Sequence, residues 1–115
     1  MKILFICTYN RCRSITAEWL YGQNSEYQVK SAGTAFGAFV EINEELLLWA
    51  DQIFVFEKAH RNSIREKYPQ HYAKLKIECL YVEDIYEPMS PILIQVLAGS
   101  LRKYLGPPNR DFKEA

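Results

Sequence analysis

The sequence lacks a net charge, because its 14 basic and 14 acidic residues cancel, and its isoelectric point is about 6.7. Without an excess of lysine and arginine, an electrostatic attraction to nucleic acid is not expected. Long apolar runs are also missing: none approaches the roughly 20 residues that a membrane-spanning helix needs. Both absences favour a soluble protein that has neither nucleic acid nor a membrane as its partner.

Cysteine and histidine are scarce. Three cysteines are an odd number, which suits a reducing cytosol better than a secreted disulfide framework. The two histidines, His60 and His71, lie in polar stretches without the spacing of metal ligands, so we expect no metal and no cofactor. The N-terminus enters an apolar segment directly and has no signal-peptide pattern. These features predict a cytoplasmic protein; the oligomeric state is left open.

Apolar segments and helical patterns alternate along the 115 residues, a length that suits one domain. Strands are expected over Lys2–Ile6, Tyr27–Lys30, Ile53–Phe56 and Leu75–Val82. Helices are expected over Arg13–Gly22, Glu41–Ala50, Lys58–Tyr68 and from Ser90 to Gly106. This alternation predicts a parallel sheet with right-handed crossovers. We therefore predict an α/β domain over residues 1–106, a three-layer flavodoxin-like doubly wound fold with a four-stranded parallel sheet, followed by a frayed tail over 107–115.

A cysteine and an arginine bracket the loop after the first predicted strand. Cys7 ends that strand, and Arg13 begins the helix six positions later. Open α/β sheets place their ligand sites at this end of the strands. Loop N–H groups and the helix N-terminus together attract an anion, and the same surroundings favour a thiolate. The pattern predicts a phosphate-ester hydrolase that forms a phosphocysteine.

The same loop resembles that of the low-molecular-weight protein tyrosine phosphatases, which reads Cys-x-x-Asn-x-Cys-Arg-Ser. Asn10, Cys12 and Ser14 fall in register with it. Three later segments are similar to that family: Ser31–Thr34, Asp51–Phe56 and, at its Asp-Pro-Tyr acid loop, Asp84–Tyr86. The resemblance extends from Met1 to Leu105 and is closest to a short bacterial subgroup of predicted tyrosine phosphatases. It implies hydrolysis of phosphotyrosine or an aryl phosphomonoester.

The chain departs from the family pattern at four positions. Tyr9 replaces a glycine of the larger enzymes, Arg11 replaces an aliphatic residue, and Ile15 and Ile85 stand where prolines are usual. These departures bear on the choice of substrate more than on the chemistry.

The loop residues can be given chemical roles. Cys7 is the expected nucleophile, which attacks phosphorus in line. Arg13 supplies a bidentate fork for two phosphoryl oxygens, and Ser14 donates to the leaving thiolate in the second step. The remaining oxygens are expected to bind the backbone N–H groups of Thr8, Tyr9, Asn10, Arg11, Cys12 and Arg13.

Asp84 is the expected general acid, because it follows the fourth predicted strand and matches the family aspartate. It would protonate the leaving oxygen and later take a proton from water. Glu83 and Glu87 flank it, and the sequence leaves them open as alternatives. Tyr9 and Tyr86 lie beside catalytic positions and are expected to bind the aromatic ring of the substrate.

Roles for three further residues are implied by the resemblance or by the residue type. The family's asparagine braces the loop, which implies contacts of Asn10 with Ser14 and Ser31, and asparagine tolerates the left-handed backbone of a tight loop. Cys12 is interpreted either as the partner of Cys7 in a reversible disulfide, which the resemblance favours, or as a small buried apolar side chain. Cys79 is expected in the core.

Three other functions compete with hydrolysis. An arsenate reductase would need further cysteines near the loop, and only Cys79 lies outside it. A phosphocysteine carrier of the sugar-transport type would lack the arginine, so Arg13 and Asp84 argue against it. An inactive module that binds phosphate or phosphotyrosine stays open, since Tyr9 could restrict access to the loop.

Overall fold

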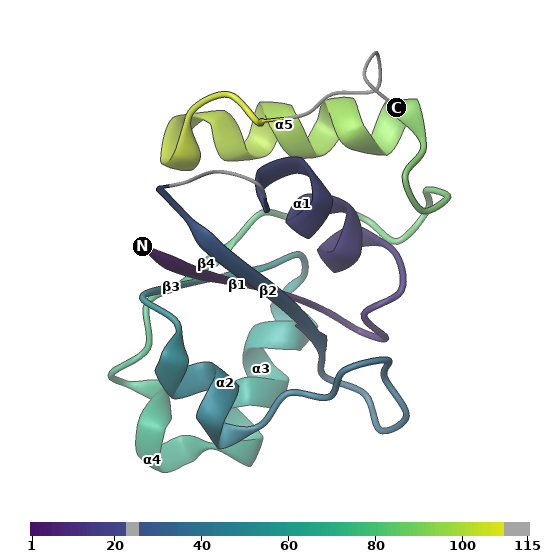
Figure 1. The fold of residues 1–115 in the computed structure, drawn as a ribbon. Coiled ribbons are helices and arrows are strands. Elements are labelled where there is room, and N and C mark those ends of the chain that lie inside the picture. The colour runs from purple at the N-terminus through teal and green to yellow at the C-terminus, as the bar shows by residue number, and fades with distance from the viewer. Residues whose placement is uncertain (23–25, 110–115) are drawn as a thin grey trace.

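A four-stranded parallel sheet forms the middle layer of the protein (Figure 1). The computed structural model describes residues 1–22 and 26–109. The strands are β1 (Lys2–Cys7), β2 (Gln28–Gly33), β3 (Gln52–Val55) and β4 (Ile77–Cys79), and their order in the sheet is β2-β1-β3-β4. All neighbours pair in parallel. The predicted α/β fold with a four-stranded parallel sheet is confirmed.

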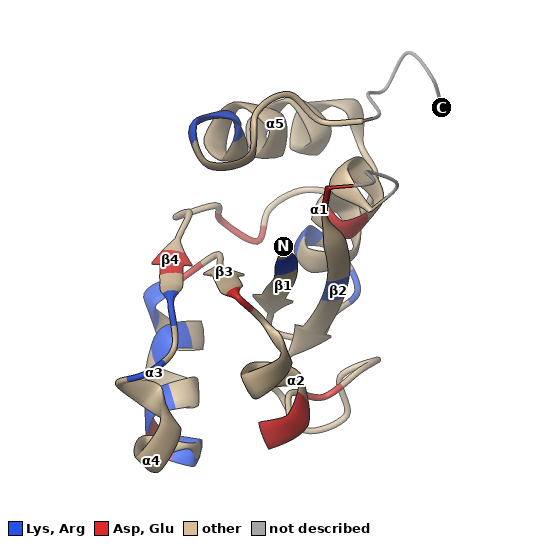
Figure 2. Ribbon diagram, turned by 60° about the vertical axis from the view of Figure 1, so that its left-hand side comes forward, with Lys and Arg blue, Asp and Glu red and all other residues tan. Residues whose placement is uncertain are grey.

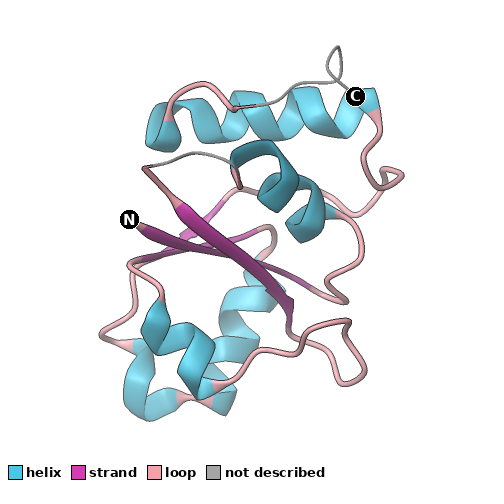
Figure 3. Cartoon of the chain, viewed as in Figure 1, coloured by secondary structure: helices cyan, strands magenta, loops and turns pink. Residues whose placement is uncertain are grey.

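Helices cover both faces of the sheet (Figure 3). One face carries α1 (Arg13–Tyr21) and α5 (Pro91–Leu105), and the other carries α2 (Glu44–Trp49), α3 (Lys58–Lys67) and α4 (Pro69–Tyr72). Successive side chains of β1 alternate between the two layers: Ile3 and Phe5 pack with α1 and α5, whereas Leu4 and Ile6 pack with the α2–α3 side. Burial on both faces explains why this strand is apolar throughout. No helix in the described ranges is long and apolar enough to span a membrane.

The last helix begins and ends as its sequence predicts. The Ser90 hydroxyl accepts a hydrogen bond from Leu93 N, and Pro91 occupies the first helical position. Gly106 ends the helix with a φ of 77°, a left-handed conformation that glycine adopts without strain. Asn109 then donates from its backbone to Leu20 O at 3.0 Å, while residues 110–115 of the predicted tail lie outside the described residues.

The second helix is shorter than predicted. Glu41 pairs with Gly33 in a parallel bridge instead of beginning a helix, because residues 40–42 run beside the end of β2. The helix starts only after Asn43, whose side chain accepts from Leu46 N at 2.8 Å. The predicted range Glu41–Ala50 is therefore wrong at both ends.

Two strand boundaries and one short helix also differ from prediction. β2 continues to Gly33, past the predicted end of this strand at Lys30. β4 ends at Cys79, before the left-handed Tyr81 (φ 55°) bends the backbone away from extended geometry. A short helix that was not predicted, α4, begins at Pro69, since proline is well suited to a first helical position.

The topology opens a crevice at the carboxyl ends of β1 and β3. The chain leaves β1 into α1 on one face, and it leaves β3 into α3 on the other face. The connections therefore diverge between these two neighbouring strands, which is the position where doubly wound sheets bind ligands. Cys7 ends β1 at this edge, Glu57 follows β3, and Asp84 follows β4.

Candidate active site

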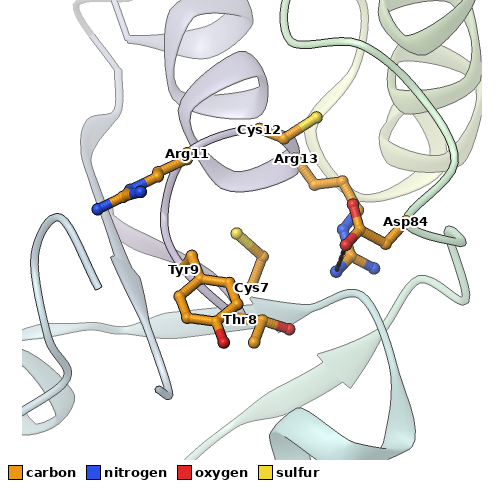
Figure 4. A pocket seen from close by; sticks show the side chains of 7 residues that line it. All are labelled: Cys7, Thr8, Tyr9, Arg11, Cys12, Arg13 and Asp84. Atoms are coloured by element: carbon orange, nitrogen blue, oxygen red, sulfur yellow. Dashed lines mark ion pairs between the residues drawn. The ribbon is translucent and has the colours of Figure 1, made fainter. Parts of the chain in front are cut away.

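A cavity of about 250 Å³ occupies this edge of the sheet. Seven residues line it, all of them predicted site residues: Cys7, Thr8, Tyr9, Arg11, Cys12, Arg13 and Asp84 (Figure 4). Six belong to the loop between β1 and α1 or to the ends of these elements, and Asp84 reaches the cavity from the loop after β4. The structure thus brings together residues that are more than 70 positions apart in sequence.

A short hydrogen-bond relay ends at the Cys7 sulfur. Asn10 Nδ2 donates to Ser14 Oγ at 2.7 Å, and Ser14 Oγ lies 3.0 Å from Cys7 Sγ. Because Ser14 already accepts from the amide, its own proton is available to the sulfur. Asn10 adopts the predicted left-handed backbone, with a φ of 58°. The arrangement stabilises negative charge on the sulfur, as a nucleophilic thiolate requires.

The loop is attached to the segment after β2 through its outward carbonyl groups. Thr34 N, Ala35 N and Phe39 N donate to the carbonyls of Cys7, Thr8 and Tyr9 at 2.9–3.0 Å. Gly33 permits this approach, because a Cβ at that position would lie 2.5 Å from Thr8 O and 2.9 Å from Asn10 N. The segment after β2 therefore sets the curvature of the loop between β1 and α1.

Arg13 is almost fully buried, with 2% of its surface exposed, and one end of its guanidinium is held firmly. Its Nη1 donates to Glu57 Oε2 and to Val82 O, each at 2.7 Å. Its Nη2 lies 4.0 Å from Asp84 Oδ2, and its Nε is buried with no hydrogen-bond partner among the described residues. Leaving a buried donor unpaired is costly, so the Nε–Nη2 edge is suited to an oxyanion. The sequence analysis missed Glu57, although an acidic residue directly after a predicted strand was the available signal.

His60 is a second residue that the sequence analysis did not place in the site. Its Nε2 lies 3.0 Å from Thr8 Oγ1, and its Nδ1 lies 3.2 and 3.1 Å from the N atoms of Phe56 and Glu57. Burial, assisted by the nearby Arg13 charge, lowers the pKa of His60 to about 4. The ring is therefore neutral at neutral pH. Its place three residues after Glu57, in a capping box at the start of α3, was its only local signal.

Three acidic residues lie on the loop between β4 and α5, part of which is red in Figure 2. Asp84 lines the cavity and is 63% exposed at its side chain, so it is accessible to substrate and water. Glu83 lines a different hollow together with Phe56 and Tyr81, and Glu87 does not line the cavity. The geometry therefore favours Asp84 over its two neighbours as the acid.

The side chain of Cys12 contacts the backbone of Tyr86. Cys12 Sγ donates to Tyr86 O at 3.2 Å, and Figure 4 shows its sulfur turned away from the Cys7 sulfur. Burial raises the pKa of the Cys12 thiol, and the neighbouring Asp84 raises it further. The Tyr86 ring packs against the α1–α5 core and does not line the cavity, unlike the prediction. Tyr9, by contrast, lines the cavity and is 53% exposed.

Ser31 supports the site differently from the contact that the resemblance implied. Its hydroxyl donates to Glu18 Oε1 at 2.6 Å, and Asn10 Oδ1, which is buried, receives no hydrogen bond from the described residues. The brace thus joins Asn10 to Ser14, while Ser31 joins β2 to α1. Cys79 is buried in the core as predicted. Within residues 1–22 and 26–109, no cluster of three or more histidine, cysteine or acidic residues could hold a metal ion.

Solved structures similar to this chain include low-molecular-weight protein tyrosine phosphatases. The low-molecular-weight protein tyrosine phosphatase from T. tengcongensis is 26% identical, with a TM-score of 0.71 over 90% of this chain and 96% of its own. The Erwinia amylovora tyrosine phosphatase amsI is 22% identical, with a TM-score of 0.73 over 95% and 93%. A cysteine-to-serine mutant of the YwlE arginine phosphatase, which carries a phosphorylated active-site serine, is 23% identical, with a TM-score of 0.62 over 91% and 98%.

Protein-family models and curated proteins give no match to the sequence. The solved structures nevertheless confirm the resemblance that the loop motif predicts, since nearly the whole chain shares its fold with low-molecular-weight protein tyrosine phosphatases.

Proposed function

We propose that this protein hydrolyses phosphotyrosine or an aryl phosphomonoester through a phosphocysteine intermediate. The observation that carries the proposal is that Cys7 and Arg13 line one cavity, and that the buried Nε of Arg13 has no hydrogen-bond partner among the described residues. The similar tyrosine phosphatases and the phosphorylated serine of the YwlE mutant support the same chemistry. The substrate is a phosphotyrosine-bearing protein or a small aryl phosphomonoester.

The first chemical step transfers the phosphoryl group to Cys7. The thiolate attacks phosphorus, the phosphorus–oxygen ester bond breaks, and the aryl oxygen leaves. Arg13 offers Nε and Nη2 to two phosphoryl oxygens, while Glu57 and Val82 O hold Nη1 in place. The carboxyl of Asp84, on the opposite side of the cavity from Tyr9 in Figure 4, gives its proton to the leaving oxygen.

The second step returns Cys7 to its thiolate. A water molecule attacks phosphorus, Asp84 takes its proton, and the phosphorus–sulfur bond breaks to release inorganic phosphate. The Ser14 hydroxyl, 3.0 Å from Cys7 Sγ, donates to the departing sulfur. This contact lowers the barrier because it strengthens as negative charge returns to the sulfur.

Hydrolysis of p-nitrophenyl phosphate between pH 4 and 9, with and without vanadate, tests the proposal. We expect turnover that vanadate inhibits, and faster release of phosphate from phosphotyrosine peptides than from phosphoserine peptides. A phosphoarginine peptide belongs in the same panel because YwlE is an arginine phosphatase. Phosphate binding without turnover would instead support the binding module, and arsenate reduction with thioredoxin would support the reductase.

Replacement of Asp84 by asparagine is expected to slow hydrolysis most for substrates whose leaving group must be protonated. For phenyl phosphate, whose leaving group is basic, kcat should fall about 100-fold. For an activated nitrophenyl ester, kcat should fall much less. Comparison of kcat across a series of phenol leaving groups measures the difference. Glu83→Gln and Glu87→Gln are the matched controls. Equal slowing of all esters by the Asp84→Asn variant would remove Asp84 as the acid.

Cys12 is proposed to protect Cys7 from irreversible oxidation in a cytoplasmic setting. A peroxide oxidises the Cys7 thiolate to a sulfenic acid, and the Cys12 sulfur then attacks it, which forms a disulfide and releases water. Cys12 must first leave its hydrogen bond to Tyr86 O.

We expect wild-type activity lost to hydrogen peroxide to return with dithiothreitol. The Cys12→Ser variant should lose activity irreversibly, because nothing intercepts the sulfenic acid before further oxidation. Residual activity after dithiothreitol is the measurement, with Cys79→Ser as the control. Equal recovery by the wild type and the Cys12→Ser variant would contradict the role of Cys12.

A further inference from the structure

Within the part of the chain that the structure describes, His60 is a buried titratable residue beside the cavity that the chemistry above does not use. Only 2% of its surface is exposed, and it lies at the start of α3, behind Thr8. A buried polar side chain can be retained for helix capping alone. The hydrogen bonds of both ring nitrogens, however, indicate a second role that is directed at the cavity.

The ring can hold its proton on only one nitrogen. Nδ1 accepts from two backbone N–H groups, those of Phe56 and Glu57, so it carries no proton itself. In the neutral ring the proton must then reside on Nε2. Nε2 lies 3.0 Å from Thr8 Oγ1 and 3.8 Å from Glu57 Oε2, so its donation goes to the threonine. The backbone of the β3–α3 junction thereby sets the tautomer.

The direction of the hydrogen bond from His60 determines whether the Thr8 hydroxyl can act as a donor in the cavity. Its hydroxyl oxygen accepts from His60, so the hydroxyl proton is free to be donated elsewhere. Thr8 lines the cavity, and Figure 4 shows its oxygen on the side that faces the Arg13 guanidinium. The charged groups that act on His60 are Arg13, Glu57 and Asp84, which surround the same side of the cavity.

We infer that the Thr8 hydroxyl donates a hydrogen bond to an oxygen of the bound phosphoryl group, and that His60 is a positioning residue that fixes the direction of this bond. The inference rests on the proposed function only in the nature of the ligand, a phosphoryl oxyanion. The Thr8 hydroxyl would thus join the backbone N–H groups and Arg13 as a donor to the phosphoryl oxygens. A chain of two aligned hydrogen bonds, from His60 through Thr8, strengthens the donor because each bond polarises the next.

The test uses Thr8→Val, which keeps the shape and removes the hydroxyl, and Thr8→Ser, which restores it. Inorganic phosphate is titrated into each protein by calorimetry, and kcat and KM for p-nitrophenyl phosphate are measured in parallel. We expect Thr8→Val to weaken phosphate binding about tenfold and to lower kcat/KM at least as much, since a hydrogen bond to a charged oxygen is lost. Thr8→Ser should recover most of the affinity. The control Ser63→Ala removes a hydroxyl from α3, outside the cavity lining.

His60→Asn separates positioning from helix capping. The asparagine oxygen can accept from Phe56 N and Glu57 N as Nδ1 does, but the side chain is too short to donate to Thr8. We expect phosphate binding to weaken about threefold, and the double variant Thr8→Val/His60→Asn to bind no worse than Thr8→Val alone. A purely structural histidine would give additive losses.

The outcomes test the Thr8 donor and the positioning role of His60 separately. Unchanged affinity in Thr8→Val, or no recovery in Thr8→Ser, would overturn the Thr8 donor, and additive losses would overturn the His60 relay. The threonine pair alone tests the donor if His60→Asn does not fold. A protein that binds phosphate through Thr8 but shows no turnover would keep this inference and remove the hydrolase proposal. A protein that binds no phosphate would remove both.

Discussion

The Cys7→Ser variant is expected to lose turnover of p-nitrophenyl phosphate by a factor of about 10⁴ or more, while it still binds inorganic phosphate and vanadate. The serine hydroxyl would occupy the sulfur position beside Ser14, but it stays protonated where a thiol ionises, so it attacks phosphorus poorly. Binding should change little, because Arg13 and the loop backbone supply the contacts to the anion. Initial rates and calorimetric titration of phosphate measure the two effects separately.

The control for this variant is Cys79→Ser, which changes a buried cysteine on β4 that does not line the cavity. We expect it to keep wild-type kcat. Turnover retained by Cys7→Ser would mean that another group is the nucleophile. Loss of phosphate affinity together with turnover would show that the substitution distorts the loop, and the Thr34, Ala35 and Phe39 bonds to the loop carbonyls would then be the first contacts to check.

Arg13→Lys should lower kcat/KM by about 10³-fold even though the positive charge is kept. A lysine presents one ammonium group, and Glu57 Oε2 and Val82 O would compete with the substrate for it. The planar guanidinium can bind the protein and the substrate at once, because Nη1 binds the protein while Nε and Nη2 remain for the ligand. The loss corresponds to the removal of preorganised donors to a transition-state oxyanion.

Steady-state kinetics on the Arg13→Lys variant, with the affinity for phosphate, provide the measurement. Arg61→Lys is the matched control, since Arg61 lies on α3 and donates to Ile77 O, away from the cavity. We expect the Arg61→Lys variant to keep its activity within about twofold, as is usual for substitutions away from the site. A loss of less than about tenfold in Arg13→Lys would show that charge alone suffices and that the bidentate geometry is not required.

Short-range features of the site were predictable. Cys7, Asn10, Arg13 and Ser14 lie within eight consecutive residues, so one loop between a strand and a helix determines their relative positions. The left-handed backbone of Asn10 was expected for a tight loop, and its contact with Ser14 was implied by the family resemblance. Alternating strands and helices likewise sufficed for the fold, because both periods depend on neighbours in sequence.

Other features depended on partners that the chain brings from far away. The Glu41–Ala50 helix was predicted too long because residues 40–42 pair with the end of β2, a contact that helical periodicity does not report. Tyr86 was expected to bind the substrate ring, yet its side chain packs against the α1–α5 core once α5 is in place.

The sequence by itself determined the sheet architecture and the loop that carries Cys7 and Arg13, since both arise from local patterns of residue type. Only the tertiary structure decided what surrounds them: Glu57 is 44 positions from the arginine that it holds, and His60 is 52 positions from Thr8. Parallel pairing of β1 with β3 places their carboxyl ends side by side, so the first residues after β3 meet the first residues after β1. No local pattern encodes that meeting, because it depends on the order of strands in the folded sheet.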